Sequence, residues 1–97
     1  MSIRRSQREA KDKCIERMRP IVKEASCKYE KGEPRGLAFI GSKIFEMAMA
    51  EKEKGALVPN TVINYWKAAL TVAEEMKLPG IVRDISRIVS GLDSKRT

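Results

Sequence analysis

The chain has 97 residues and a formal charge of +7, with 42% apolar residues, five aromatic residues and no histidine. This length suits one hydrophobic core, so we expect a single domain over residues 1–97. Without histidine there is no ordinary neutral-pH base, and two cysteines cannot complete a zinc site. We therefore expect neither an enzyme nor a bound metal or other cofactor. No secretory signal or ~20-residue apolar span is visible, which predicts a cytoplasmic protein without membrane contact.

The apolar residues recur at intervals of three and four, without the alternation of strands. This spacing predicts an all-α, compact domain of about four helices, at residues 3–31, 37–54, 60–77 and 80–92. Gly and Pro punctuate the chain between these segments, at 32–36, 55–59 and 79–80. Short frayed ends are expected at 1–3 and 93–97.

The first predicted helix has one apolar stripe that continues across Pro20. Because the phase of the stripe does not shift, we expect Pro20 to bend one helix; two helices, with Pro20 opening the second, are the alternative. The two cysteines, Cys14 and Cys27, are read as core residues of a reducing compartment. Along this helix the expected inward side chains are Ala10, Cys14, Met18, Ile21, Val22, Ala25 and Tyr29.

The second predicted helix is apolar over more than half of its circumference. One face carries Leu37, Ile40, Ile44, Met47 and Ala48. A helix with this much apolar surface needs cover on two sides, so we expect Phe39, Phe45 or Met49 to contact a second copy, in a homodimer, or another protein. The helix ends in the charged run 51–54, which we expect to be solvated.

The third predicted helix contains the only tryptophan, and the other helices should pack on it. Asn60 or Thr61 is the expected N-cap, and Trp66 should lie against Ile44 or Met47. The expected inward residues are Val62, Trp66, Ala69, Leu70, Ala73 and Met76, and the outward ones are Asn64, Lys67, Ala68, Thr71 and Glu75. The fourth helix repeats the pattern with Ile81, Val82, Ile85, Ile88, Val89 and Leu92.

The positive charge is concentrated at the two ends of the chain. Residues 1–36 hold eleven Lys or Arg against six Asp or Glu, residues 37–79 are neutral, and residues 80–97 hold four against two. This distribution predicts a nucleic-acid partner, DNA ahead of RNA, and a regulatory or architectural role. The basic edge of the first helix comprises Arg4, Arg8, Lys11 and Arg19, with Arg5 beside it and the acidic residues of that helix on another side. If the two ends meet, they form one positive surface.

The segment 58–66 resembles the entry of a recognition helix in a helix-turn-helix motif. Thr61, Asn64 and Lys67 would then face outward, toward bases or phosphates. A plain helical hairpin fits the same pattern, because the preceding helix is longer than the motif requires and Glu51 takes the place of its small residue. The alternative function is a helical protein-binding module, an inhibitor or adaptor that docks on a larger assembly.

Overall fold

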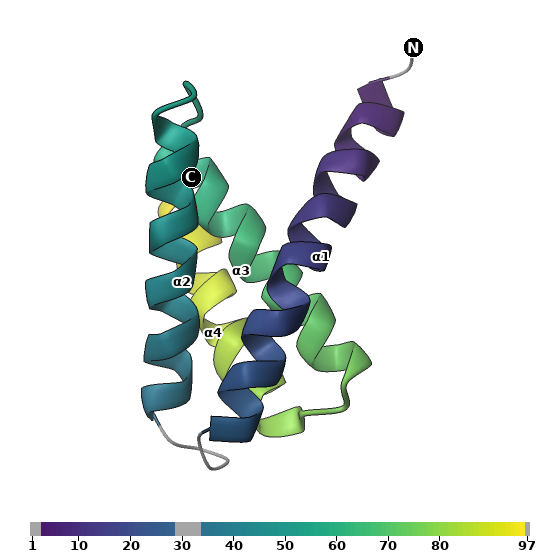
Figure 1. Cartoon of the computed structure of the whole chain (residues 1–97), viewed down its shortest axis with the longest axis vertical. Coiled ribbons are helices and arrows are strands. Elements are labelled where there is room, and N and C mark those ends of the chain that lie inside the picture. Colours follow the sequence, from purple (N-terminus) through teal and green to yellow (C-terminus); the bar gives the residue numbers. More distant parts are fainter. Residues whose placement is uncertain (1–2, 29–33, 97) are drawn as a thin grey trace.

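The computed structural model describes the backbone of residues 3–28 and 34–96, and the side chains of residues 11–28 and 35–93. These residues form four helices: α1 (Ile3–Lys28), α2 (Pro34–Lys52), α3 (Val58–Glu75) and α4 (Pro79–Arg96) (Figure 1). The described ranges contain no strand. The predicted all-α architecture of four helices is therefore confirmed. α1 runs through Pro20 without interruption, as expected of one helix; its bend stays a prediction.

α3 is the central helix. It packs against α1, α2 and α4, whereas α1 and α4 do not touch each other within the described ranges. Trp66 is only 7% exposed and belongs to the same core as Ile44 and Ile85, which confirms its expected burial. The helices approach closely here, because a methyl group at Gly41 would lie 3.4 Å from Cζ2 of Trp66. The beginning of α1 and the end of α4 lie apart in Figure 1, so the two basic ends of the chain do not meet there.

Most of the predicted apolar faces turn inward. On α1, Met18, Val22 and Ala25 are buried. Cys14 is half-buried, but Cys27 is exposed, so the core role predicted for Cys27 is wrong; both thiols are free. The other fully buried apolar side chains come from α2, α3 and α4: Ile40, Ile44, Ala48, Tyr65, Ala69, Val72, Ala73 and Ile85. Tyr29 and Gly32 lie outside the described residues.

The boundaries of α2, α3 and α4 differ from the sequence prediction by one to four residues at each end. α2 begins at Pro34, which was assigned to a turn; proline fits the first helical turn because its missing N–H would have no partner there. α3 begins at Val58 with Leu57 as N-cap and no capping side chain. The Thr61 hydroxyl instead donates to the Leu57 carbonyl at 2.9 Å. α4 continues past its predicted end at Leu92 to Arg96. The fraying expected at residues 93–97 stays a prediction.

The inward face of α3 is broader than predicted. Ala68 was expected to face solvent and is 3% exposed, and Met76 was expected to face the core and is 37% exposed. Ile63 and Tyr65, which were not assigned to the inward face, are also buried. The physical reason is that three helices surround α3, so a single stripe does not describe its contacts.

The turn after α3 contains the only described non-glycine residue with a left-handed backbone, Lys77 (φ 56°). The Leu78 N–H donates to the Ala73 carbonyl at 3.1 Å, the long bond of a Schellman turn. Glycine adopts this conformation without the penalty of a Cβ atom. We therefore expect Lys77→Gly to raise the free energy of unfolding by about 0.5–1 kcal/mol in urea titrations. Lys77→Ala, which removes the same charge but keeps Cβ, is the control; equal stability of both variants would contradict the strain argument.

Candidate functional site

The N-terminal half of α1 is the part of the described chain that stands furthest from the bundle. In Figure 1 it diverges from α2 and α3 as it approaches the N-terminus. Arg4, Arg5 and Arg8 belong to this half, although their side chains lie outside the described set. Lys11 and Lys13 follow and are exposed, and neither forms an ion pair within the described part of the chain. Lys13 was not among the predicted site residues. The half-helix therefore carries five cations close together in sequence.

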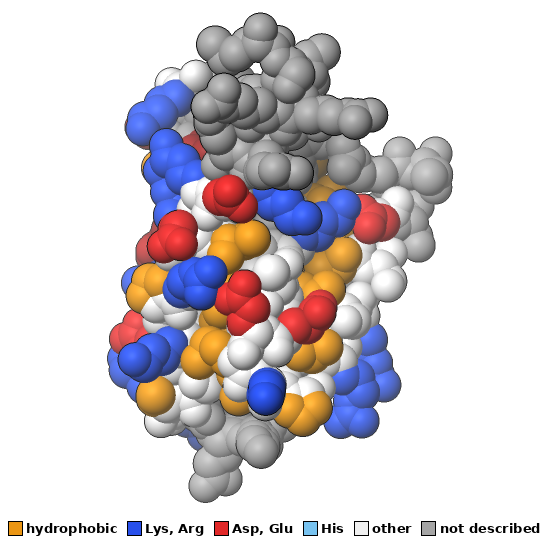
Figure 2. Space-filling model, turned by 90° about the vertical axis from the view of Figure 1, so that its right-hand side faces the viewer, with side chains coloured by type: hydrophobic (Ala, Val, Ile, Leu, Met, Phe, Trp, Pro, Cys, Tyr) orange, Lys and Arg blue, Asp and Glu red, His pale blue; other side chains and the backbone are white. Residues whose placement is uncertain are grey.

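Arg19 does not continue this basic edge as a free cation. Its guanidinium lies 2.9 Å from the Glu75 carboxylate and 3.5 Å from that of Glu16. The expected separation of acidic residues from this flank is therefore wrong at Arg19. The face shown in Figure 2 likewise mixes acidic and basic side chains around exposed apolar ones, so its described part does not present one sign of charge.

The three residues of α3 that were predicted to contact nucleic acid have different environments. Thr61 is buried, with 9% exposure, so its predicted outward orientation is wrong. Asn64 is exposed as expected. Lys67 is also exposed, but its ammonium lies 3.6 Å from the Asp93 carboxylate on α4. Because α3 is surrounded by the other helices, the exposed strip left for a recognition surface is narrow.

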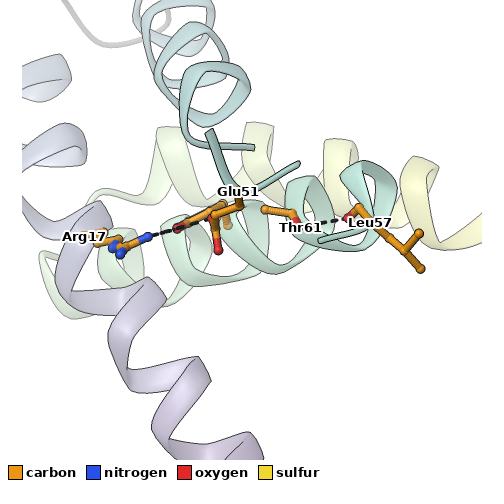
Figure 3. A network of polar contacts seen from close by, with 5 residues as sticks. Arg17, Glu51, Leu57 and Thr61 are labelled. Carbon is orange, nitrogen blue, oxygen red and sulfur yellow. Dashed lines mark hydrogen bonds and ion pairs between the residues drawn. The ribbon is translucent and has the colours of Figure 1, made fainter. Parts of the chain in front are cut away.

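A polar pocket of about 290 Å³ lies where α1, α2 and α3 meet. Arg17 crosses it: Nη1 donates to the Tyr65 hydroxyl at 2.6 Å and lies 3.8 Å from Oε2 of Glu51. Figure 3 shows Arg17 extending from α1 toward Glu51, with Thr61 and Leu57 beyond it. The residues that line the pocket are Lys13, Cys14, Arg17, Glu51, Thr61, Asn64 and Tyr65.

Glu51 faces inward, although it belongs to the run that the sequence predicted to be solvated. Its Oε2 is buried and accepts no hydrogen bond from the described residues. The nearby Arg17 guanidinium compensates this charge without a short contact. The Arg17 and Glu51 side chains are 40% and 34% exposed, so water screens their attraction and this ion pair adds little to the packing of α1 against α2.

The Tyr65 phenol, the Cys14 thiol and the Arg17 guanidinium of this pocket keep their protons at neutral pH. Burial, together with the Glu51 carboxylate and against the effect of Arg17, raises the pKa of Tyr65 to about 12. Burial also raises the pKa of the Cys14 thiol, with Glu51 acting in the same direction. The hydrogen bond to Tyr65 raises the pKa of Arg17. A protonated thiol is a poor nucleophile, and a protonated phenol does not act as a base.

The spacing of residues along α2 does predict that Glu51 belongs to this cluster. Ile44, Ala48 and Glu51 follow one another at intervals of four and three, so Glu51 continues the inward stripe of α2. A carboxylate on an apolar stripe requires a cationic or donor partner. The distant partners Arg17 and Tyr65, however, come from other helices and cannot be chosen by spacing alone.

The described chain is thus a small basic four-helix domain with one internal polar cluster. Comparisons with protein-family models, with curated proteins and with solved structures find nothing that matches it. Among the described residues, no three Cys, Asp or Glu side chains gather in a way that could hold a metal ion. Within the same ranges, no helix combines the length and hydropathy of a membrane span.

Proposed function

We propose that this chain binds nucleic acid, with duplex DNA preferred over RNA, through the N-terminal half of α1. The supporting observation is that this half-helix diverges from the bundle while carrying Arg4, Arg5, Arg8, Lys11 and Lys13. Elsewhere in the described structure, Arg17, Arg19 and Lys67 are engaged with carboxylates. Lys11 and Lys13 are the cations of this half-helix whose side chains are described; both are exposed, and neither forms an ion pair among the described residues.

The chemistry of such a contact is electrostatic. Arg4, Arg8 and Lys11 follow at intervals of four and three, which places them along one side of a helix. A row of cations at this spacing can neutralise phosphates and release counterions, which supplies affinity without reading bases. The proposed role is therefore regulatory or architectural. Specific recognition would need Asn64, the exposed amide of α3.

The test is the salt dependence of binding to a random duplex, measured by fluorescence anisotropy between ~50 and ~200 mM salt. We expect Arg4→Glu/Arg8→Glu to weaken binding to all sequences about equally and to lower the salt slope by about two. The matched control is Arg83→Glu/Arg87→Glu on α4, which changes the net charge equally on a helix that does not contact α1. Asn64→Ala should leave the affinity for random duplexes unchanged. If α3 contacts base edges, this variant should also discriminate less between DNA sequences.

Two results would contradict the proposal. The wild-type protein could fail to bind duplex DNA or RNA at ~50 mM salt, where phosphate contacts are strongest. The α4 control could also weaken binding as much as the α1 variant, which would mean that net charge acts without any site on α1.

The alternative function is a protein-binding module, and a second surface favours it. An open depression of about 590 Å³ at the α3–α4 turn is lined by Leu78, Pro79 and Val82, with Glu74, Lys77 and Arg83 at its sides. An apolar floor with charges of both signs around it suits a segment of another protein that carries apolar and charged side chains. This function predicts no duplex binding at physiological salt, and the loss of a protein partner when the α1 arginines are reversed.

A further inference from the structure

α2 has a second apolar stripe on the side that faces away from the core. Phe45 is 59% and Met49 38% exposed, and Ala38 and Ser42 are exposed on the same side. These four positions follow at intervals of four, three and four, which is the spacing of a coiled-coil seam. The inward side of α2 is already covered by α1, α3 and α4, and α2 forms one edge of the bundle in Figure 1. The outward stripe is therefore available to a partner.

Two copies of this stripe fit each other when they run antiparallel, because large side chains at one end then face small side chains at the other. Ala38 and Ser42 are small, whereas Phe45 and Met49 are large. If two α2 helices pack antiparallel about a two-fold axis between Ser42 and Phe45, Phe45 of each copy faces Ser42 of the other, and Met49 faces Ala38. Large side chains then fill the space beside small ones. A parallel pair would oppose Phe45 to Phe45 and Ala38 to Ala38, with crowding at one end and voids at the other.

The charges on the flank of the stripe fit the same arrangement. Arg35 lies in the first turn of α2, and Glu53 directly follows its last residue, Lys52; both are exposed. The Glu53 N–H still donates to the Met49 carbonyl at 3.4 Å, as in a helix. Eighteen residues are about five helical turns, so Arg35 and Glu53 lie on the same side at the two ends of the helix. In the antiparallel pair, Arg35 of one copy lies beside Glu53 of the other, and symmetry repeats this contact. In a parallel pair this flank of one helix faces the opposite flank of the other, so Arg35 and Glu53 would not meet across the seam.

A third feature of the same flank concerns Phe39. The Lys28 and Lys43 ammonium groups each lie 5.7 Å from the centre of its ring. Glu46 of the same chain lies 3.8 Å from the Lys43 ammonium, so the charges beside Phe39 are partly balanced within one copy. The charge contacts between copies are therefore those at the two ends of the stripe.

We propose that the outward face of α2 is a homodimer interface, in which the α2 helices of two copies pack antiparallel through Ala38, Ser42, Phe45 and Met49. The interface is independent of the nucleic-acid proposal, because it involves neither the N-terminal half of α1 nor its cations. A dimer of this kind presents two basic α1 arms in one particle. A single helix pair buries little surface, so we expect a reversible dimer with a dissociation constant in the micromolar range.

The experiment is sedimentation equilibrium of the full chain from about 1 to about 200 µM, a range that brackets a weak dimer. We expect the wild type to dimerise with concentration, and Phe45→Lys and Met49→Lys each to weaken association at least about tenfold. Both side chains are already exposed, so helicity and thermal unfolding of the monomeric variants should be unchanged. The matched control is Met76→Lys at the C-cap of α3, a methionine with 37% exposure, and this variant should not alter association.

The orientation is tested by exchanging charges. Arg35→Glu alone should weaken the antiparallel dimer, because it places two acidic residues together, and Arg35→Glu/Glu53→Arg should restore it. An effect of Phe45→Lys without any effect of Arg35→Glu would overturn the antiparallel arrangement. A wild type that stays monomeric at about 200 µM, or a dimer that persists in both lysine variants, would overturn the interface and leave this face to a different protein.

Discussion

Replacing Trp66 with alanine is expected to lower the free energy of unfolding by about 3–5 kcal/mol, a large part of the total stability of a domain this small. The indole is 7% exposed and lies in the core that all four helices share. Gly41 brings the α2 backbone close to the ring, so few small movements are available to fill the space that the substitution leaves.

The measurement is thermal and urea unfolding followed by circular dichroism, since the variant loses the tryptophan fluorescence signal. Lys67→Ala is the matched control on the next residue: Lys67 is exposed and its ion pair with Asp93 spans 3.6 Å, so we expect a change within about 0.5 kcal/mol. A Trp66→Ala variant that melts with the wild type would contradict the central position of α3 in the core.

Helix positions could be predicted because local spacing carries the information. Met18, Val22 and Ala25 on α1 repeat at helical intervals, and the structure buries all three. The helix boundaries were harder to predict, because Pro34 is compatible both with a turn and with the first residue of a helix. The local sequence does not decide between these two conformations.

The polar contacts could not be predicted, because they join residues that are distant in sequence. Arg17 meets Tyr65 across 48 residues, and Arg19 meets Glu75 from another helix. Helical spacing shows which side of a helix a charge occupies, but not which carboxylate faces it in the folded chain. The sequence therefore predicted a free cation at Arg19, where the structure has an ion pair. For Lys11 the prediction of an exposed cation agrees with the structure, since Lys11 forms no ion pair within the described ranges.

High pH is expected to destabilise the fold through Tyr65. The pKa of its phenol is raised from 10.0 to about 12 in the folded chain, first by burial and then by Glu51. Below pH 10 the phenol is protonated in both states and contributes no pH dependence. Between about pH 10 and 12 the unfolded chain loses this proton first, so the unfolded state is favoured as the pH rises. A shift of this size corresponds to a loss of about 2–3 kcal/mol once the pH exceeds both pKa values.

The comparison that isolates this effect is wild type against Tyr65→Phe in urea titrations from about pH 9 to about pH 12. Tyr65→Phe should cost about 1 kcal/mol at neutral pH, because the 2.6 Å hydrogen bond from Arg17 is lost. Above pH 10 the wild type should lose stability faster than the variant, so the difference between them shrinks and then reverses. The lysines and Tyr29 are present in both proteins, and their titration therefore cancels in the difference. Parallel pH profiles for the two proteins would mean that the Tyr65 phenol ionises as easily in the folded chain as in the unfolded one, and that it is not enclosed by Arg17 and Glu51 in solution.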